Sequence, residues 1–278
     1  MSEHRNGLTP LQRLVIYHAN CIDGYTAAWV AWLRFGDADT EYVPASYGDA
    51  APDVTGRDVF IVDFSYPRSV MLAMKESASH VLVLDHHKTA QAALEGLPFA
   101  IFDMNRSGAG LAYDELHGRA ARPWLVDYVE DRDLWRWALR DSKEVNAWIG
   151  ACKRESFADW SVLHDAGVQA ARARGEAVLT FIDRYVSEMV KQARLVDFEG
   201  HRIPIVNAPY INISELVGKL AESAPFAIGW FHRADGLYAY SLRSRGTDGV
   251  DVSEIAKKYG GGGHRNSAGF AVAERLPL

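Results

Sequence analysis

Cysteine is scarce in this chain, with only Cys21 and Cys152 among 278 residues. Two cysteines exclude a disulfide framework and indicate a reducing compartment. The sequence also lacks any apolar run near the ~18 residues that a membrane-spanning helix needs, and its polar start has no signal-peptide core. We therefore expect a cytoplasmic protein that has no membrane partner.

Positive charge is also in short supply, because 30 lysines and arginines face 36 acidic residues and leave a net charge of −6. A protein that holds long nucleic acid mainly through its phosphates needs a basic face, so the net charge argues against this class. The composition, at 48% hydrophobic and 24% charged, is that of an ordinary globular protein. The length fits one large or two ordinary domains.

Three short apolar runs, rich in valine and typical of buried strands, end in side chains that can bind metal ions. They are Leu14–Tyr17 before His18, Val59–Val62 before Asp63, and Val81–Leu84 before Asp85, His86, His87 and Lys88. A single polar strand end is common and need not be functional. Open α/β sheets place their chemistry at the carboxyl ends of strands, so three such ends predict one site.

Alternation of strand and helix patterns predicts an α/β fold with a doubly wound, largely parallel sheet over residues 1–150. Residues 151–196 are expected to form a helical linker, with one amphipathic helix over 177–196. Residues 197–278 then change to short strands and predict a smaller α/β domain. Gly260–Gly263 is expected to be a loop.

Tryptophan is concentrated in the helical region, at Trp124, Trp135, Trp137, Trp148 and Trp160. We expect these side chains to pack in the core, because large aromatic residues usually contribute through burial. Stacking of one of them on a nucleobase is the alternative.

The candidate metal ligands combine imidazoles with carboxylates, which favours Mn²⁺ or Mg²⁺ over Zn²⁺ or iron. They are His18, Asp23, Asp63, His86 and one of Asp131 and Asp133, which the sequence does not separate. Each alone has an alternative as a cap, a turn acid or a surface charge. Asp63 is our choice to bridge two ions about 3.5–4 Å apart, the arrangement used to cleave phosphate esters.

His87 and Lys88 follow His86 directly and are suited to phosphate contacts or to protonation of a leaving oxygen. For Lys88 the alternative is a solvated surface charge. Ser107 is expected to be an ordinary helix N-cap, in preference to presenting a helix N-terminus to the substrate.

The four consecutive glycines Gly260–Gly263 precede His264. Such a run lets backbone N–H groups approach a phosphate, although glycine-rich turns alone are weak evidence. Arg243 ends the preceding predicted strand and suits a terminal phosphate. The candidate substrate-binding residues are Asn20, Lys88, Arg243, Gly261, Gly262, Gly263 and His264.

The motifs resemble those of the DHH phosphoesterase superfamily, and most of all its bacterial nanoRNase (oligoribonuclease) branch. The matching stretches, in the family's order, are YHANCIDGYTAAW, IVDFS, VLDHHKTA, YVEDRDLW, YSLRS and DVSEIAKKYGGGGHRNSAGF. The resemblance implies a DHH catalytic domain, a C-terminal DHH-associated domain, two Mn²⁺ ions (Mg²⁺ as alternative) and hydrolysis of phosphodiesters from one end. It implies a substrate held between the domains, and it adds His87 to the substrate-binding positions.

The first motif departs from the family's His-x-Asp-x-Asp-Gly, because this chain has an extra residue and an asparagine, Asn20, near the first acid. Asn20 offers only a neutral oxygen, which weakens one metal position. Cys21 as a ligand would favour Zn²⁺, but we favour a small buried residue.

We therefore expect a metal-dependent phosphodiesterase that hydrolyses short oligonucleotides to nucleoside monophosphates, with Asp63, His86 and His87 as catalytic residues. The alternatives are a 3′-phosphoadenosine-phosphate phosphatase, a cyclic (di)nucleotide phosphodiesterase, or a nucleotide-binding sensor with a degraded metal site. A RecJ-like DNA exonuclease is opposed by the charge. Small phosphorylated nucleotides are the other expected partners. Substrate length, end polarity and formation of a homodimer stay open.

Overall fold

The computed structural model describes residues 12–118, 121–246 and 249–278, so the polar start of the chain lies outside the described residues. The chain divides into two compact units. The first unit comprises the residues up to His86 together with Ala93–Ala173, and the second comprises His87–Ala92 and Arg174–Leu278. Each unit is described by itself below.

The first unit is built on a five-stranded parallel sheet, which confirms the predicted α/β fold. In the order β2-β1-β3-β4-β5, the strands are Thr40–Ala45, Arg13–His18, Asp58–Val62, His80–Asp85 and Ala100–Phe102. Val59, Ile61, Val81 and Val83 are fully buried, as expected for central strands.

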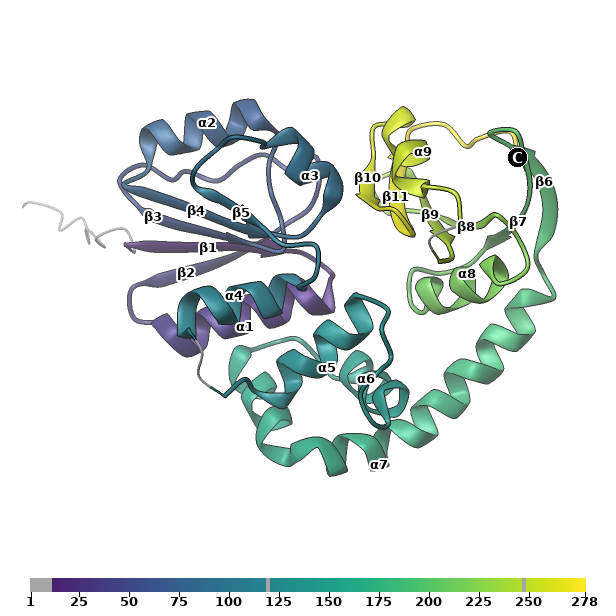
Figure 1. Ribbon diagram of the computed structural model, residues 1–278, viewed down its shortest axis with the longest axis horizontal. Helices are drawn as coiled ribbons and strands as arrows, with labels where there is room; N and C mark the ends of the chain where they lie inside the picture. Colours follow the sequence, from purple (N-terminus) through teal and green to yellow (C-terminus); the bar gives the residue numbers. More distant parts are fainter. Residues whose placement is uncertain (1–11, 119–120, 247–248) are drawn as a thin grey trace, which may run out of the picture. The chain divides into compact units, whose positions relative to one another are not determined.

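Helices cover both faces of this sheet (Figure 1), so strand residues on either face enter a core. Val15 packs with α1 (Ile22–Phe35) and α4 (Gly108–His117), whereas Leu14 and Ile16 pack with α2 (Arg68–Ser77). This alternation follows from the two-residue period of a strand. Two covered faces leave the strand ends as the accessible edge, where polar side chains can gather.

The tryptophan-rich region forms α5 (Trp124–Asp133), α6 (Ser142–Ala151) and the start of α7 (Phe157–Val190). Trp160 is fully buried in the core, as expected. The expectation of burial is wrong for Trp135, which is 48% exposed. The helix α5 ends just before this residue, and Trp135 has a left-handed backbone conformation (φ 55°).

The second unit contains a six-stranded mixed sheet in the order β10-β11-β9-β8-β7-β6. These strands are Gly262–His264, Ser267–Val272, Tyr238–Ser244, Phe226–His232, His201–Asn207 and Arg194–Phe198. Among the described strands of this sheet, β7 and β8 alone pair in parallel, and the crossover helix α8 (Ile213–Ala221) joins them. The unit also contains α9 (Val252–Lys258) and most of α3 (Lys88–Ala93).

Two predicted boundaries are wrong in this region. The helix expected over 177–196 ends at Val190, and β6 begins at Arg194. The apolar residues near its expected end serve the sheet instead, as Val196 lies in the core with strand residues. The glycine run expected to be a loop enters strand β10 at Gly262, because β11 supplies an antiparallel partner. No helix in the described part of the chain is long and apolar enough to cross a bilayer.

The core of the second unit contains a stack of aromatic rings, which predicts a stability cost on truncation. Phe270 stacks on Tyr240 at 4.9 Å and on Tyr259 at 4.6 Å between ring centroids. We expect Phe270→Ala to lower the free energy of unfolding of this unit by about 3–5 kcal/mol and Phe270→Leu by clearly less. Chemical denaturation followed by circular dichroism measures both, and equal stability of wild type and Phe270→Ala would contradict the stack's role.

Candidate metal centre at the strand ends

Asp63 lies between two imidazoles at the carboxyl edge of the first sheet. Its Oδ2 is 3.5 Å from His18 Nδ1 at the end of β1, and its Oδ1 is 3.2 Å from His86 Nε2 just after β4. In-register pairing of β1, β3 and β4 places these strand ends level with one another. The two oxygens of one carboxylate therefore face different ligands, which is the geometry of a bridging group.

The backbone of Asp63 is held in a left-handed conformation (φ 55°), and its side chain is 1% exposed. A non-glycine residue in this region costs roughly 1–3 kcal/mol and persists where the surrounding packing fixes it. A Cβ atom on Gly108 would lie 2.3 Å from the Asp63 Cβ, and one on Gly24 would lie 2.4 Å from the His18 carbonyl oxygen. Glycine at both positions therefore lets α1 and α4 approach these residues closely.

Asp23 is fixed by the N-terminus of α4. Its Oδ2 accepts a hydrogen bond from the Gly108 N–H (2.6 Å), and its Oδ1 accepts one from the Ala109 N–H (3.1 Å). Ser107 caps the helix by accepting from the Gly110 N–H, as expected. N–H groups at the start of a helix stabilise negative charge. At α4, the Gly108 and Ala109 N–H groups already donate to the carboxylate of Asp23.

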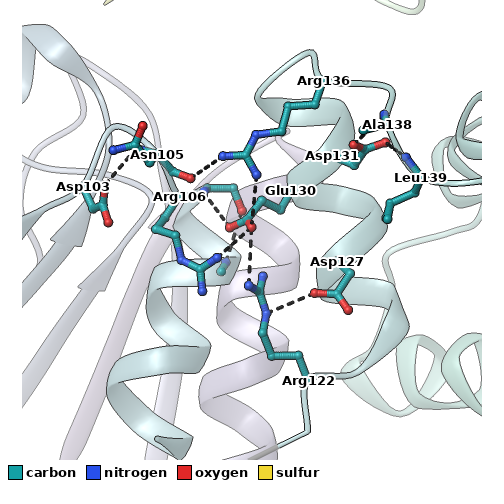
Figure 2. A network of polar contacts seen from close by, with 12 residues as sticks. Asp103, Asn105, Arg106, Arg122, Asp127, Glu130, Asp131, Arg136, Ala138 and Leu139 are labelled. Atoms are coloured by element: carbon teal, nitrogen blue, oxygen red, sulfur yellow. Dashed lines mark hydrogen bonds and ion pairs between the residues drawn. The ribbon is translucent and has the colours of Figure 1, made fainter. Parts of the chain in front are cut away.

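Of the two acids that the sequence left unseparated, Asp133 is the one that approaches the cluster. Its Oδ2 is 3.4 Å from His86 Nε2, and Asp23 Oδ2 is 3.6 Å from the same nitrogen. Asp131 instead accepts hydrogen bonds from the N–H groups of Ala138 and Leu139, as Figure 2 shows, and from the Ser142 hydroxyl. Asp131 thus holds the loop after α5.

Asp85 is a further acid at this edge that the sequence analysis placed in the motif but not among the ligands. It ends β4, is fully buried, and accepts a hydrogen bond from the His86 N–H at 2.7 Å. Its charge is one of those that raise the pKa of His18 against the lowering effect of burial. The signal available in the sequence was its position, the same as that of His18 and Asp63 at their strand ends.

The altered first motif places Asn20 and Cys21 differently. Asn20 is exposed and left-handed (φ 56°), whereas the Cys21 sulfur lies within 4.8 Å of ligand atoms of His18 and Asp63. Burial, followed by the charges of Asp63, Asp133 and Asp23, raises the pKa of the Cys21 thiol well above its ordinary value. The Cys21 sulfur thus lies beside the oxygen and nitrogen donors of this set.

The electrostatics of the cluster show an excess of buried negative charge. Burial, followed by the neighbouring charges of Asp63 and Asp133, raises the pKa of Asp23 well above its ordinary value. Burial lowers the pKa of His86, but its hydrogen bond to Asp63 and the charges of Asp133, Asp63 and Asp23 raise it well above its ordinary value. Carboxylates packed this closely away from water call for a compensating cation.

The donor set fits divalent metal ions. Among the described residues, two groups within the first unit have ligand atoms within 4.8 Å of one another, namely His18, Cys21 and Asp63, and Asp23, His86 and Asp133. Asp63 joins the two groups through its contact with His86. Carboxylate and imidazole donors suit Mn²⁺ and Mg²⁺-like ions, and two adjacent groups suit a pair of them.

Glu130 is a buried acid beside the candidate metal ligands, and its carboxylate contacts several arginines. The sequence alone did not indicate this role. Figure 2 shows three guanidinium groups converging on its carboxylate, those of Arg106, Arg122 and Arg136, with nitrogen–oxygen distances of 2.9, 3.4 and 3.7 Å. Its other oxygen accepts from the Ser107 N–H at 3.1 Å. Glu130 therefore joins α5, which carries Asp133, to the end of α4 that holds Asp23.

Two of the predicted substrate-binding residues of the second unit, Arg243 and His264, lie in one row across its sheet. His264 of β10 pairs with Ser267 of β11, and Ser267 pairs with Arg243 of β9. The guanidinium of Arg243 donates to the Ser214 hydroxyl at 2.7 Å, which orients it from α8. His87 stacks on His264 with ring centroids 4.8 Å apart.

The glycines and Lys88 are placed as follows within the same unit. A Cβ on Gly261 would lie 2.1 Å from the Gly269 carbonyl oxygen, so only glycine fits there. Gly262 and Gly263 lie beside Thr89, whose hydroxyl oxygen accepts from the Gly263 N–H at 3.3 Å. Lys88 donates to Asp251 at 2.7 Å and lies 3.6 Å from Glu254, so its charge is engaged by acids of α9 and its N-cap.

The comparisons agree with this fold and motif set. No protein-family model matches the chain. The exonuclease RecJ bound to manganese is similar in structure, with a TM-score of 0.55, 16% identity, and coverage of 95% of this chain and 87% of the other, which shows the fold. The resemblance to the DHH phosphoesterases is confirmed by this fold together with the sequence similarity to Oligoribonuclease NrnB.

Two curated proteins are similar in sequence along nearly the whole chain. Oligoribonuclease NrnB of Bacillus subtilis is 25% identical over 94% of this chain and 73% of its own length. An uncharacterized protein, R106, of Acanthamoeba polyphaga mimivirus is 28% identical over 94% of this chain and 67% of its own.

The different surroundings of Asp63 and Asp131 predict different effects on metal binding. Loss of a residue that hydrogen-bonds to a metal ligand weakens metal binding by roughly 10–100-fold. We expect Asp63→Asn to weaken Mn²⁺ binding by more than this, because Asp63 is a proposed ligand. We expect Asp131→Asn to weaken Mn²⁺ binding by less than Asp63→Asn does. Isothermal titration calorimetry on refolded, EDTA-stripped protein measures both. Equal Mn²⁺ affinity of Asp63→Asn and wild type would exclude Asp63 as a ligand.

The position of Glu130 predicts an indirect effect on the same site. Glu130→Gln removes the charge that balances three guanidinium groups, so α4 and α5 should hold Asp23 and Asp133 less firmly. We expect about a tenfold loss of Mn²⁺ affinity, by analogy with other residues that orient ligands. Glu115→Gln, at an exposed position of α4, is the matched control. If both variants bind Mn²⁺ alike, Glu130 has no positioning role.

Proposed function

We propose that this protein is a divalent-metal-dependent phosphodiesterase that hydrolyses short oligonucleotides to nucleoside monophosphates from one end. The observation that supports this most directly is Asp63, whose two oxygens face His18 and His86, with Asp23 and Asp133 close to the same Nε2 atom of His86. The proposed ligands are His18, Asp23, Asp63, Asp85, His86 and Asp133. Asp63 is the proposed bridge between two ions.

When bound, divalent ions at such a site lower the pKa of water and neutralise charge on a phosphate. The chain's own residues determine where this happens. The α4 N-terminus holds Asp23 through two N–H groups, and in-register strands hold His18 and Asp63, so the donors need little reorganisation. We assign His87, next to His86 in sequence, to phosphate contact and to protonation of the leaving oxygen.

The substrate-binding role is assigned to the row formed by Arg243 and His264, together with Gly262 and Gly263. A guanidinium oriented by a hydrogen bond suits the two oxygens of a terminal phosphate, and it loses less freedom on binding than an unrestrained one. Lys88 is the weakest of the proposed phosphate contacts, because Asp251 already accepts from its ammonium group.

Two further observations favour a short substrate. The net charge of −6 argues against a protein that holds a long strand mainly through its phosphates. The curated relative from Bacillus subtilis is named an oligoribonuclease. Manganese is the proposed ion in view of the donor set and of the manganese bound by the similar RecJ structure, with Mg²⁺ as the alternative.

A substrate panel tests the proposal. With Mn²⁺, we expect the protein to convert di- to pentanucleotides to nucleoside monophosphates and to leave long strands largely intact. Asp63→Asn should lose this activity, whereas Asp53→Asn, an exposed turn acid of the same unit, should keep it. The panel includes 3′-phosphoadenosine phosphate and cyclic dinucleotides. Faster hydrolysis of either would replace the proposed substrate, and no hydrolysis of any phosphodiester would reject the enzyme.

The exposed Trp135 gives a second prediction for the same reaction. It lies two residues after Asp133, on the loop that Asp131 holds, and contacts Trp137 edge-to-face at 5.1 Å. We propose that a nucleobase stacks on it. Loss of one stacked base costs about 1–3 kcal/mol, so Trp135→Ala should raise KM for a trinucleotide at little change in kcat. The control is Trp135→Phe, which should restore most of the affinity; unchanged KM in Trp135→Ala would contradict stacking.

A further inference from the structure

A pocket of about 420 Å³ lies in the second unit, away from the residues assigned to hydrolysis. It is formed where β7 and β8 end and where β9 begins, and Arg275 of the C-terminal tail completes it. Tyr238 opens β9, whereas Arg243 lies five residues further along the strand. At about 3.4 Å per residue, the two positions are roughly 17 Å apart.

The pocket lies at one end of the second sheet, where two parallel strands end. Strands β7 and β8 are the parallel pair of the second sheet, joined by α8, and the pocket lies at their carboxyl ends. In open α/β sheets, nucleotides and similar ligands bind outside the carboxyl ends of parallel strands. The second unit therefore has a strand-end pocket of its own, built from different residues than the metal centre.

The lining combines flat aromatic faces with a guanidinium and an imidazole group. The guanidinium of Arg275 lies 4.7 Å from the centre of the Trp230 ring, and His232 stacks on Tyr238 with centroids 4.6 Å apart. Trp230 and Tyr238 are only partly buried, and both Arg275 and His232 are exposed. Stacked guanidinium and aromatic planes are surfaces on which nucleobases stack, while guanidinium and imidazole groups also donate hydrogen bonds to phosphate.

We propose that this pocket binds a nucleotide, with the base stacked against the Trp230–Arg275 and Tyr238–His232 pairs and its phosphate contacted by Arg275 and His232. A volume of about 420 Å³ is within the usual range of small-molecule sites and has room for one mononucleotide. The inference does not depend on the proposed hydrolysis, because none of these residues is assigned to that reaction.

The test is a titration of the full chain with adenosine 5′-monophosphate in excess EDTA, followed by NMR of the backbone and of the tryptophan indole N–H groups. We expect saturable shifts at Trp230, Tyr238 and His232. Arg275→Ala and His232→Ala should each weaken binding by about tenfold, the loss expected for a charge-assisted contact. Arg202→Ala, at an exposed arginine elsewhere in the same sheet, should bind as wild type does.

Separate titrations with adenosine and with inorganic phosphate measure the contributions of the nucleoside and of the phosphate. We expect adenosine and phosphate each to bind more weakly than adenosine 5′-monophosphate. Adenosine binding as tightly as the monophosphate would overturn the proposed phosphate contacts. Three results would overturn the proposed nucleotide binding in this pocket. They are no saturable shifts, shifts confined to Arg243 and Gly261–His264, and an affinity that is unchanged in both Arg275→Ala and His232→Ala. Repeating the titration in Asp63→Asn separates this result from the outcome of the hydrolysis assay.

Discussion

Burial of several carboxylates at one sheet edge is the constraint on which the first unit depends. Asp23, Asp63 and Asp85 are almost fully buried there, with the imidazole of His86 among them. Removing like charges from water is unfavourable unless opposite charge or directed N–H groups compensate. The N–H groups at the start of α4 supply part of this for Asp23, and the donor atoms that remain are suited to divalent ions.

Close packing around Asp63 holds this arrangement in place. Gly24 and Gly108 let two helices approach the strand ends to distances that any Cβ would prevent, and Glu130 joins α4 to α5 through its arginine partners. The loop after α5 is fixed separately by Asp131. The two adjacent acids in α5 thus serve structure, whereas Asp133, at the end of the helix, reaches His86.

The sheet of the second unit carries a separate group of polar and aromatic residues at each end of its strands. Arg243 and His264 are aligned by antiparallel pairing near the glycine run, while Trp230, Tyr238 and Arg275 gather at the other end of the strands. The parallel β7–α8–β8 crossover is what creates the second edge, because it brings two strand ends together without a hairpin to close them.

The sequence alone determined the sheet of the first unit, since continuous apolar strands and their polar ends are local patterns that survive folding. It also determined the strand-end positions of His18, Asp63 and His86 for the same reason. Tertiary structure decided that Asp133 rather than Asp131 approaches His86, because the direction of a side chain at the end of a helix depends on the loop that follows. It also decided the contacts of Glu130 and Asp85 and the end of α7, which depend on residues distant in sequence.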